Sequence, residues 1–292
     1  MSTTSLSSAL AESLGSEVVA SAAVGGGDVA RSFRVDLADG RRVFAKTHPH
    51  APAVFFTTEA TGLRWLRAVG VVAVPEVLAV SDGDPSSGVP NLLALEWIAE
   101  GPARAGTEEE LGRALAAVHA APWPCFGRPD GATTGSRGLP NDRCDTWAGF
   151  YGSRRLVPLA RLARDTGALD PVAADGLEAL AGRLGDLGGP VESPSLLHGD
   201  LWAGNRLVDT EGRNWLIDPA AHGGHREFDL AMMRLFGGFG PACFAAYDEA
   251  LPLADGWEAR VALHQIAPLV VHAIKFGGGY VRSATEAVAR YC

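Results

Sequence analysis

The sequence predicts an α+β fold with two lobes, a small strand-rich N-terminal lobe and a larger, mostly helical C-terminal lobe. Short apolar runs separated by glycine-containing turns dominate residues 18–96 and are typical of antiparallel strands. Apolar residues at helical spacing dominate from residue 107 onwards. We therefore place a hinge near residues 97–102 and predict an N-terminal lobe over 1–98 and a C-terminal lobe over 99–292.

The N-terminal lobe is expected to contain five strands and one main helix. An amphipathic pattern over residues 5–15 also predicts a short first helix that ends at Gly15. Asp39-Gly40 is typical of a hairpin turn between two strands. The strands are predicted at Val18–Val24, Ser32–Leu37, Arg42–Lys46 and within residues 74–84 and 90–101, and the main helix at Val54–Val69.

The C-terminal lobe begins with a clear helix signal. Thr107 followed by Glu110 resembles a capping box, which predicts a helix start at Thr107. Residues 121–141 are rich in glycine, proline and polar groups and are expected to form a loop. Further helices are predicted over residues 143–165, over 171–184 and from Glu227 to the C-terminus.

The composition indicates an ordinary globular protein. A chain of 292 residues with 47% hydrophobic and 20% charged residues is long enough to bury a sizeable core. The net charge of −9 argues against a nucleic-acid-binding surface. No apolar run approaches the roughly 18 residues of a membrane span, and the N-terminus lacks a signal peptide's basic region, which favours a cytoplasmic location. Four cysteines without CxxC spacing are expected to be free thiols: Cys125, Cys144, Cys243 and Cys292.

The segment LLHGDLWAGN, residues 196–205, places a carboxylate and an amide directly after an apolar run. Leu196-Leu197 predicts a short buried strand, and a hairpin is expected to follow. In that hairpin Leu207 and Val208 would pair with Leu216 and Ile217. Such a hairpin would return Asp218 beside Asp200 and Asn205.

Two carboxylates and an amide at one end of a small sheet are suited to phosphoryl transfer. Asn205 and Asp218 offer the hard oxygen ligands that Mg²⁺ prefers. Asp200 could accept the proton of a hydroxyl group, and the Asp200–Asn205 spacing matches kinase catalytic loops. The alternative interpretation is that these residues only cap loops.

The N-terminal lobe carries the second set of candidate residues. Gly25, Gly26 and Gly27 lie between two predicted strands, where backbone N–H groups could approach phosphate. Lys46 ends the third strand, and Glu59 lies thirteen residues later on the predicted helix, as expected for a phosphate-binding ion pair.

The use of lysine supports a special role for Lys46. The chain has 25 basic residues, of which only Lys46 and Lys275 are lysines. A guanidinium group is bulkier than a point charge and would not replace it at such a site. The alternatives are a solvated lysine at a strand end for Lys46 and a surface residue for Lys275. In the strand that leads into the hinge, Glu96 and Ile98 could offer backbone groups to adenine.

Other chemistries are less well supported. His198, His222 and His225 are candidates for a metal cluster, but they lack the helical spacing or cysteine partners of zinc sites. His198 is instead expected to hold the catalytic loop through hydrogen bonds. The sequence contains no GxSxG, Walker or SxxK motif.

Several motifs together resemble the fructosamine kinase family, also called ketosamine-3-kinases. These enzymes have the protein-kinase-like fold shared with aminoglycoside phosphotransferases. The resemblance extends over about residues 5–290. It rests on VGGGDVARSFRV…VFAK, LGRALAAVHAAP, DTWAGFYGSRRL, LLHGDLWAGN and LIDPAAHGGHREFDLAM.

The resemblance implies ATP-dependent phosphorylation of the 3-hydroxyl of a ketosamine, followed by release of the amine. Asp200 would then be the base, Asn205 and Asp218 would bind Mg²⁺, and Lys46 with Glu59 would order the ATP phosphates. Trp202 would form a wall of the sugar site, in which we also place His198.

The resemblance also bears on structural residues, specificity and assembly. We interpret Glu227 and Asp229 as structural, favoured by the helix dipole in the first turn of the following helix. Specificity is expected to reside in the 121–141 loop and in 143–156. Asp28 stands where some relatives have a cysteine that can link two subunits, so we expect a monomer.

Two alternatives remain open. One is a kinase of the same fold that acts on an aminoglycoside, a choline-like compound or another metabolite. The other is a nucleotide-binding module without turnover, although Lys46, Asp200, Asn205 and Asp218 are all present.

Overall fold

The computed structural model describes residues 3–25, 30–84, 88–134 and 138–292. Its contacts divide the chain into two compact units. The first comprises residues 1–107, 133–138 and 204–221, and the second comprises residues 108–132, 139–203 and 222–292.

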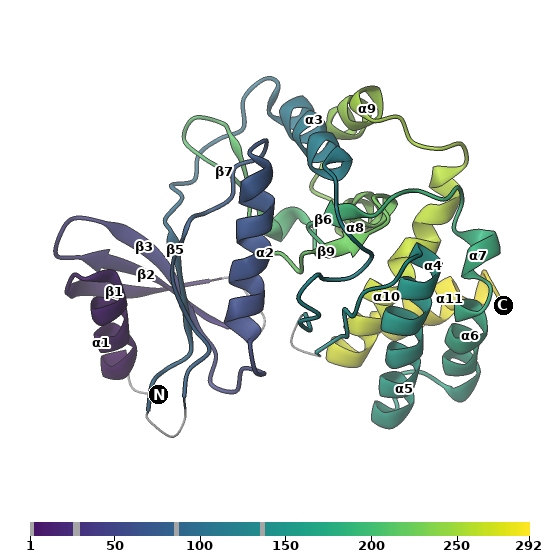
Figure 1. Ribbon diagram of the computed structural model, residues 1–292, viewed down its shortest axis with the longest axis horizontal. Coiled ribbons are helices and arrows are strands. Elements are labelled where there is room, and N and C mark those ends of the chain that lie inside the picture. The colour runs from purple at the N-terminus through teal and green to yellow at the C-terminus, as the bar shows by residue number, and fades with distance from the viewer. Residues whose placement is uncertain (1–2, 26–29, 85–87, 135–137) are drawn as a thin grey trace. The chain divides into compact units, whose positions relative to one another are not determined.

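The first unit is built around a five-stranded antiparallel sheet with the strand order β1-β2-β3-β5-β4. Figure 1 shows α1 and α2 on the two sides of this sheet. The elements are α1 (Thr3–Leu14), β1 (Val18–Val24), β2 (Arg31–Leu37), β3 (Arg42–Thr47), α2 (Phe55–Val69), β4 (Val77–Ser81) and β5 (Leu92–Glu96).

Alternation along β3 gives the sheet two different faces. Val43 and Ala45 are buried against Leu6 and Leu10 of α1, on the side that carries the sheet's apolar cluster. Lys46 projects from the alternate face and contacts α2. The predicted strands and the predicted main helix are therefore confirmed.

A hairpin of β7 (Arg206–Val208) and β8 (Asn214–Leu216) completes the first unit. The Leu216 N–H donates to the Ala73 carbonyl, and the Gly101 N–H donates to the Val208 carbonyl. Gly101 permits this close approach, because a Cβ there would lie 2.6 Å from the Cα of Thr210. Residues 204–221 thus pack with the first unit, although they lie within the range predicted as the C-terminal lobe. The functional division at residues 98 and 99 stays a prediction.

The hairpin is confirmed, but its predicted register is wrong. Leu207 lies opposite Trp215 and Val208 lies opposite Asn214, rather than opposite Leu216 and Ile217. The cause is the turn, where the Asp209 carboxylate accepts the N–H groups of Glu211 and Arg213. This side chain closes the loop at residues 209 and 213 and so sets the pairing.

The second unit is mostly helical, with one short antiparallel pair, β6 and β9 (Figure 1). Its core joins leucines of the central helices, such as Leu159, Leu177 and Leu263, to Val288 near the C-terminus. The elements are α3 (Thr107–Ala120), α4 (Trp147–Tyr151), a π-helical turn (Gly152–Leu156), α5 (Val157–Thr166), α6 (Pro171–Ala181), α7 (Leu184–Leu187), β6 (Ser195–Leu197), a 3₁₀ turn (Ala203–Asn205), β9 (His222–Gly224), α8 (Glu227–Phe236), α9 (Pro241–Ala250), α10 (Trp257–Phe276) and α11 (Gly279–Ala289).

Details of the predicted helices differ from the structure. The helix expected over 143–165 begins only at Trp147 and contains the π-helical turn, and the helix expected over 171–184 ends at Ala181. Thr107 is the first residue of α3, and its hydroxyl accepts the Arg104 N–H and donates to the Gly212 carbonyl. The predicted helix start at Thr107 is therefore confirmed, and the capping box stays a prediction. The bond to Gly212 also ties this hydroxyl to a partner distant in sequence.

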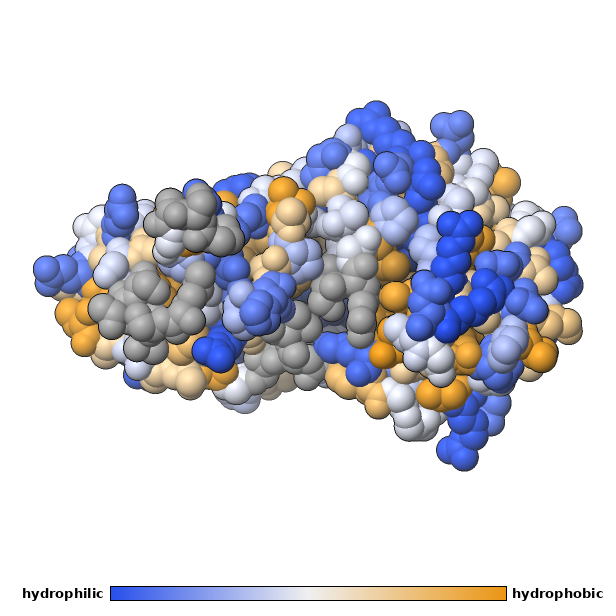
Figure 2. Space-filling model, turned by 90° about the horizontal axis from the view of Figure 1, so that it is seen from below, coloured by the Kyte–Doolittle hydropathy of each residue, from blue (hydrophilic) through white to orange (hydrophobic). Residues whose placement is uncertain are grey.

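The surface of the protein is mixed in character. On the face shown in Figure 2, hydrophobic residues lie in small groups among hydrophilic ones. No helix within the described part of the chain is both long and apolar enough to cross a membrane. None of the four cysteines, all of which the structure describes, forms a disulfide bond, as predicted.

Candidate active site

A buried lysine forms the centre of the candidate site in the first unit. Lys46 is only 5% exposed, and its Nζ lies 2.9 Å from Oε1 of Glu59 on α2. The same Nζ donates to Oδ1 of Asp218, which follows β8. The structure thus brings together three of the predicted site residues, and we refer to Lys46, Glu59 and Asp218 as the ion trio.

The electrostatics of the ion trio keep the lysine charged. Burial alone lowers the pKa of Lys46, but the carboxylates of Glu59 and Asp218 raise it by more. The net effect is a pKa above the ordinary value for lysine. The ammonium group of Lys46 is therefore charged in the folded protein, and two carboxylates hold it in place.

A residue that the sequence analysis missed orients α2. Asp82 accepts the backbone N–H groups of Phe56 and Thr57 through Oδ1, at 2.9 and 3.1 Å. It acts as the N-terminal cap of α2, although it lies 26 residues after Phe56. The only signal in the sequence is an aspartate after a strand, which is too common to be specific.

Asn205 and Asp218 lie at the open end of the β7–β8 hairpin. The Ile217 N–H donates to the Asn205 carbonyl at 3.0 Å, which holds the two sides of the hairpin together there. Asp218 has a left-handed backbone with a φ of 55°, a conformation that costs about 1–2 kcal/mol in a non-glycine residue. Its bond to Lys46 offsets this strain.

A glycine on α2 admits the segment that follows Asp218. A Cβ at Gly62 would lie only 3.0 Å from the Cβ of Ala221 and 3.5 Å from Cγ of Pro219. The absence of a side chain at this position lets residues 219–221 pack against the helix that carries Glu59. This contact helps to place Asp218 within the ion trio.

The other predicted nucleotide-binding residues are less constrained. Gly25 is exposed just after β1, whereas Gly26 and Gly27 lie outside the described residues. Glu96 is the last residue of β5, and its N–H donates to the Glu76 carbonyl at 3.0 Å. Ile98 is half-buried two residues later. The roles of these residues toward ATP stay predictions.

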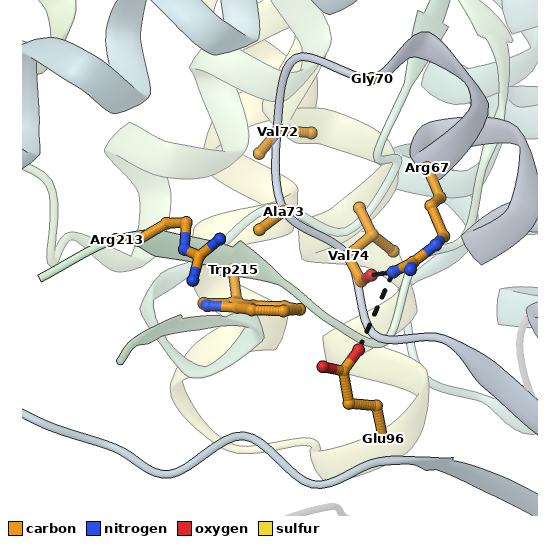
Figure 3. Close-up of a pocket in the computed structure, with 8 residues that line it drawn as sticks. All are labelled: Arg67, Gly70, Val72, Ala73, Val74, Glu96, Arg213 and Trp215. Carbon is orange, nitrogen blue, oxygen red and sulfur yellow. Dashed lines mark hydrogen bonds and ion pairs between the residues drawn. The ribbon is translucent and has the colours of Figure 1, made fainter. Parts of the chain in front are cut away.

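The Glu96 side chain faces an open pocket of about 350 Å³ in the first unit (Figure 3). Its carboxylate lies 3.8 Å from the Arg67 guanidinium, which also donates to the Val74 carbonyl. Arg213 lies over the Trp215 ring and pairs with Asp209. Because both arginines have acidic partners within the protein, the pocket does not require a charged ligand. The residues that line it are Arg67, Gly70, Val72, Ala73, Val74, Glu96, Arg213 and Trp215.

In the second unit, the loop after β6 carries Asp200. Leu197 pairs with His222 of β9, after which the backbone turns at Gly199 with a φ of 80°. The Asp200 N–H donates to Nδ1 of His198 at 3.3 Å. His198 is fully buried, so its ring supports the loop from within.

The side chain of Asp229 on α8 binds the backbone of this loop. Its carboxylate accepts the N–H of His198 at 2.7 Å and the N–H of Gly199 at 2.9 Å. Nε2 of His119 lies 3.2 Å from the same carboxylate. Burial raises the pKa of Asp229, but these partners lower it by more. The net pKa therefore lies below the ordinary value for aspartate. The sequence analysis assigned Asp229 to the helix dipole and missed this role in holding the loop. The available signal was a carboxylate in the first turn of a helix.

The structure therefore places the predicted residues in two groups. The ion trio and Asn205 belong to the first unit, whereas His198, Asp200 and Trp202 belong to the second. Asp200 is half-buried and Trp202 is 40% exposed. The return of Asp218 beside Asp200 stays a prediction.

The buried histidines do not form the cluster considered from the sequence. Among the residues that the structure describes, the side chains of His225, Glu227 and His264 come within 4.8 Å of one another. Arg260 already binds the Glu227 carboxylate with two hydrogen bonds, at 2.9 and 2.5 Å. This guanidinium supplies the positive charge that a metal would bring, so the group is a structural polar cluster.

Comparisons with known proteins identify the family to which this chain is similar. The family model for fructosamine kinase matches residues 2–292. The chain is 35% identical over 273 residues to a protein of Lactiplantibacillus plantarum described as a probable ketoamine kinase, covering 92% of each chain. A crystal structure from Thermobifida fusca, assigned as a fructosamine-3-kinase, has 38% identity and a TM-score of 0.88, covering 99% of this chain and 98% of that one.

A more distant structure defines the fold. An aminoglycoside phosphotransferase in complex with ADP and hygromycin B is 17% identical and has a TM-score of 0.62, covering 98% of each chain. Together with the sheet and the helical second unit, these likenesses confirm the predicted two-lobed, protein-kinase-like α+β fold.

Proposed function

Because the chain belongs to the fructosamine kinase family and is a phosphotransferase acting on ketoamines, we propose that it transfers a phosphoryl group from ATP to the 3-hydroxyl of a ketosamine. A fructosamine or a ribulosamine would serve as substrate. The ion trio is the observation that best supports this proposal, since phosphoryl transfer depends on positioned positive charge.

Lys46 is suited to bind the ATP phosphates. Its ammonium group is buried, charged and held by Glu59 and Asp218, so little rearrangement is needed when an anion binds. The glycines at residues 25–27 would supply backbone N–H groups to the same phosphates, and the backbone of Glu96 and Ile98 would contact adenine.

The donor set at the end of the β7–β8 hairpin fits Mg²⁺. Asn205 offers a carboxamide oxygen and Asp218 a carboxylate oxygen, and Ile217 joins the two sides of the hairpin. When bound, the ion would neutralise phosphate charge. These two residues would hold it, and Lys46 would limit the motion of Asp218.

Asp200 would accept the proton of the attacking 3-hydroxyl. Asp229 fixes the backbone of the two residues before Asp200, and His198 accepts the N–H of Asp200. We therefore assign His198 a positioning role and Trp202 the contact with the sugar. The phosphorylated adduct would then break down and release the amine. A monomeric state and a cytoplasmic location stay predictions.

A substrate screen tests the proposal. ATP consumption is measured with a fructosyl-amine, a ribulosyl-amine, an aminoglycoside and choline, and the product is located by ³¹P NMR. We expect turnover only with the ketosamines, giving a 3-phosphate. Turnover confined to choline or the aminoglycoside, or a phosphate on another hydroxyl, would contradict it.

A further inference from the structure

Five aromatic side chains of the second unit form a continuous row that starts at the catalytic loop. The ring centroids are 6.1 Å apart for Trp202 and Phe236, 4.9 Å for Phe236 and His272, and 5.0 Å for His272 and Tyr280. Phe276 lies 5.5 Å from His272 and 6.0 Å from Tyr280. We call these five residues the aromatic row.

Tight backbone contacts position the row beside the catalytic loop. Helix α8 ends at Phe236, and Gly238 follows with a φ of 89°. A Cβ at Gly238 would lie 2.2 Å from the Cβ of Ala203, so this loop packs directly against the residue after Trp202. His272 is held by Nδ1, which lies 2.8 Å from the Pro268 carbonyl within α10.

The two ends of the row are open to solvent. Trp202 is 40% exposed and Phe276 is 47% exposed, whereas the rings between them are half-buried. Large aromatic rings that remain this exposed next to a catalytic loop are typical of ligand contacts, because their faces bind both apolar groups and cations.

The outer end of the row also carries a positive charge. Nζ of Lys275 lies 4.7 Å from the centre of the Phe276 ring. Lys275 is the second of the two lysines in a chain that otherwise uses arginine for its basic residues. An ammonium group on a flexible stem at this position can pair with a carboxylate that lies along the row.

We propose that the aromatic row binds the amine component of the ketosamine, and that Lys275 selects amine components that carry a carboxylate. This inference rests on the proposed function. The preferred substrates are ketosamines whose amine component carries an aromatic ring and, beyond the ring, a carboxylate. The protonated secondary amine lies near Trp202 and Phe236, the ring lies on Phe276 and Tyr280, and the distal carboxylate pairs with Lys275.

Four substrates separate the two contributions. The fructosyl adduct of 4-(2-aminoethyl)benzoate has both a ring and a distal carboxylate, N-fructosyl-phenethylamine has the ring alone, the fructosyl adduct of 6-aminohexanoate has the distal carboxylate alone, and N-fructosyl-methylamine has neither. We expect kcat/KM to be highest for the aminoethylbenzoate adduct and at least tenfold lower for the methylamine adduct.

Two variants assign the contributions to residues. Phe276→Leu should raise KM about fivefold for the two substrates with a ring, and Lys275→Gln should raise KM about threefold for the two with a carboxylate. Neither variant should change kcat, or KM for the methylamine adduct, by more than twofold. Lys275→Arg should restore most of the carboxylate preference, and Arg290→Gln, which removes an exposed charge elsewhere on the second unit, serves as the control.

Binding measurements provide a readout that does not depend on turnover. Calorimetric titration of the fructosyl adduct of 4-(2-aminoethyl)benzoate without ATP should show the same weakening in Phe276→Leu and Lys275→Gln, with melting temperatures near that of the parent protein. Equal kcat/KM for all four substrates, or unchanged KM in both variants, would overturn the inference and leave the proposed function intact. A protein that phosphorylates none of the four, and none of the matching ribulosyl adducts, fails the proposed function itself.

Discussion

The two units hold their key residues in different ways. In the first unit the Lys46 side chain is fixed directly by two carboxylates, and the whole group is largely buried. In the second unit Asp200 is placed indirectly, because Asp229 and His198 hold the backbone around it. The difference shows two ways of fixing a functional group, one through its side chain and one through the backbone that carries it.

The largest expected effect comes from removing the proposed base, Asp200. Asp200→Asn should lower kcat by about 10³-fold, since general base catalysis contributes about 10²–10⁴-fold. ATP affinity, measured by calorimetry, should change little because the ion trio is intact. Asp175→Asn, an exposed carboxylate on α6, is the matched control. Near-normal turnover in Asp200→Asn would remove this residue from the mechanism.

A second test alters the rigid side chain in the first unit. Lys46→Arg keeps the charge but forces a larger group between Glu59 and Asp218, so kcat/KM should fall by about 10²-fold. Steady-state kinetics at varied ATP would measure this loss. Arg42→Lys, an exposed change on the same strand, should stay within twofold of the parent protein. A Lys46→Arg enzyme of normal activity would show that a point charge is not required.

A third test alters the backbone support of Asp200. Asp229→Asn keeps the shape but removes the charge that accepts two N–H groups, and should lower stability by about 1–3 kcal/mol. It should also lower kcat about tenfold with little change in KM for ATP, because only the second unit is affected. Denaturant unfolding and kinetics measure the two effects. Loss of stability at unchanged kcat would limit Asp229 to a structural role.

The smallest effect on activity is expected for a change at His225. Its effect should be seen in how the free energy of unfolding depends on pH. Burial lowers the pKa of this histidine to about 4, so the folded protein keeps it neutral. The unfolded chain binds the proton near the ordinary pKa of about 6.5, so the contribution to stability is complete above that pH and is lost as the pH falls toward 4. The loss should be about 3 kcal/mol by urea unfolding across this window. His225→Gln should flatten the dependence, and an unchanged slope would contradict the assignment.

Much of the fold could be predicted because its signals are local. Alternation in β3 and helical spacing in α2 identify both elements, and the spacing of Lys46 and Glu59 correctly predicted their contact. The hairpin was predicted for the same reason. Its register was not, since the Asp209 side chain rather than the apolar pattern sets it.

By itself, the sequence determined the strand and helix pattern of each unit and the chemical groups at the candidate site. Periodicity and residue type carry that information, because they act over a few neighbouring positions. Only the tertiary structure decided that Asp82 caps α2, that Asp229 holds the loop of Asp200, and that rings from four segments form one row. Asp229 lies 31 residues from the N–H of His198 that it accepts. Contacts of this kind depend on how the chain packs, and no local pattern records them.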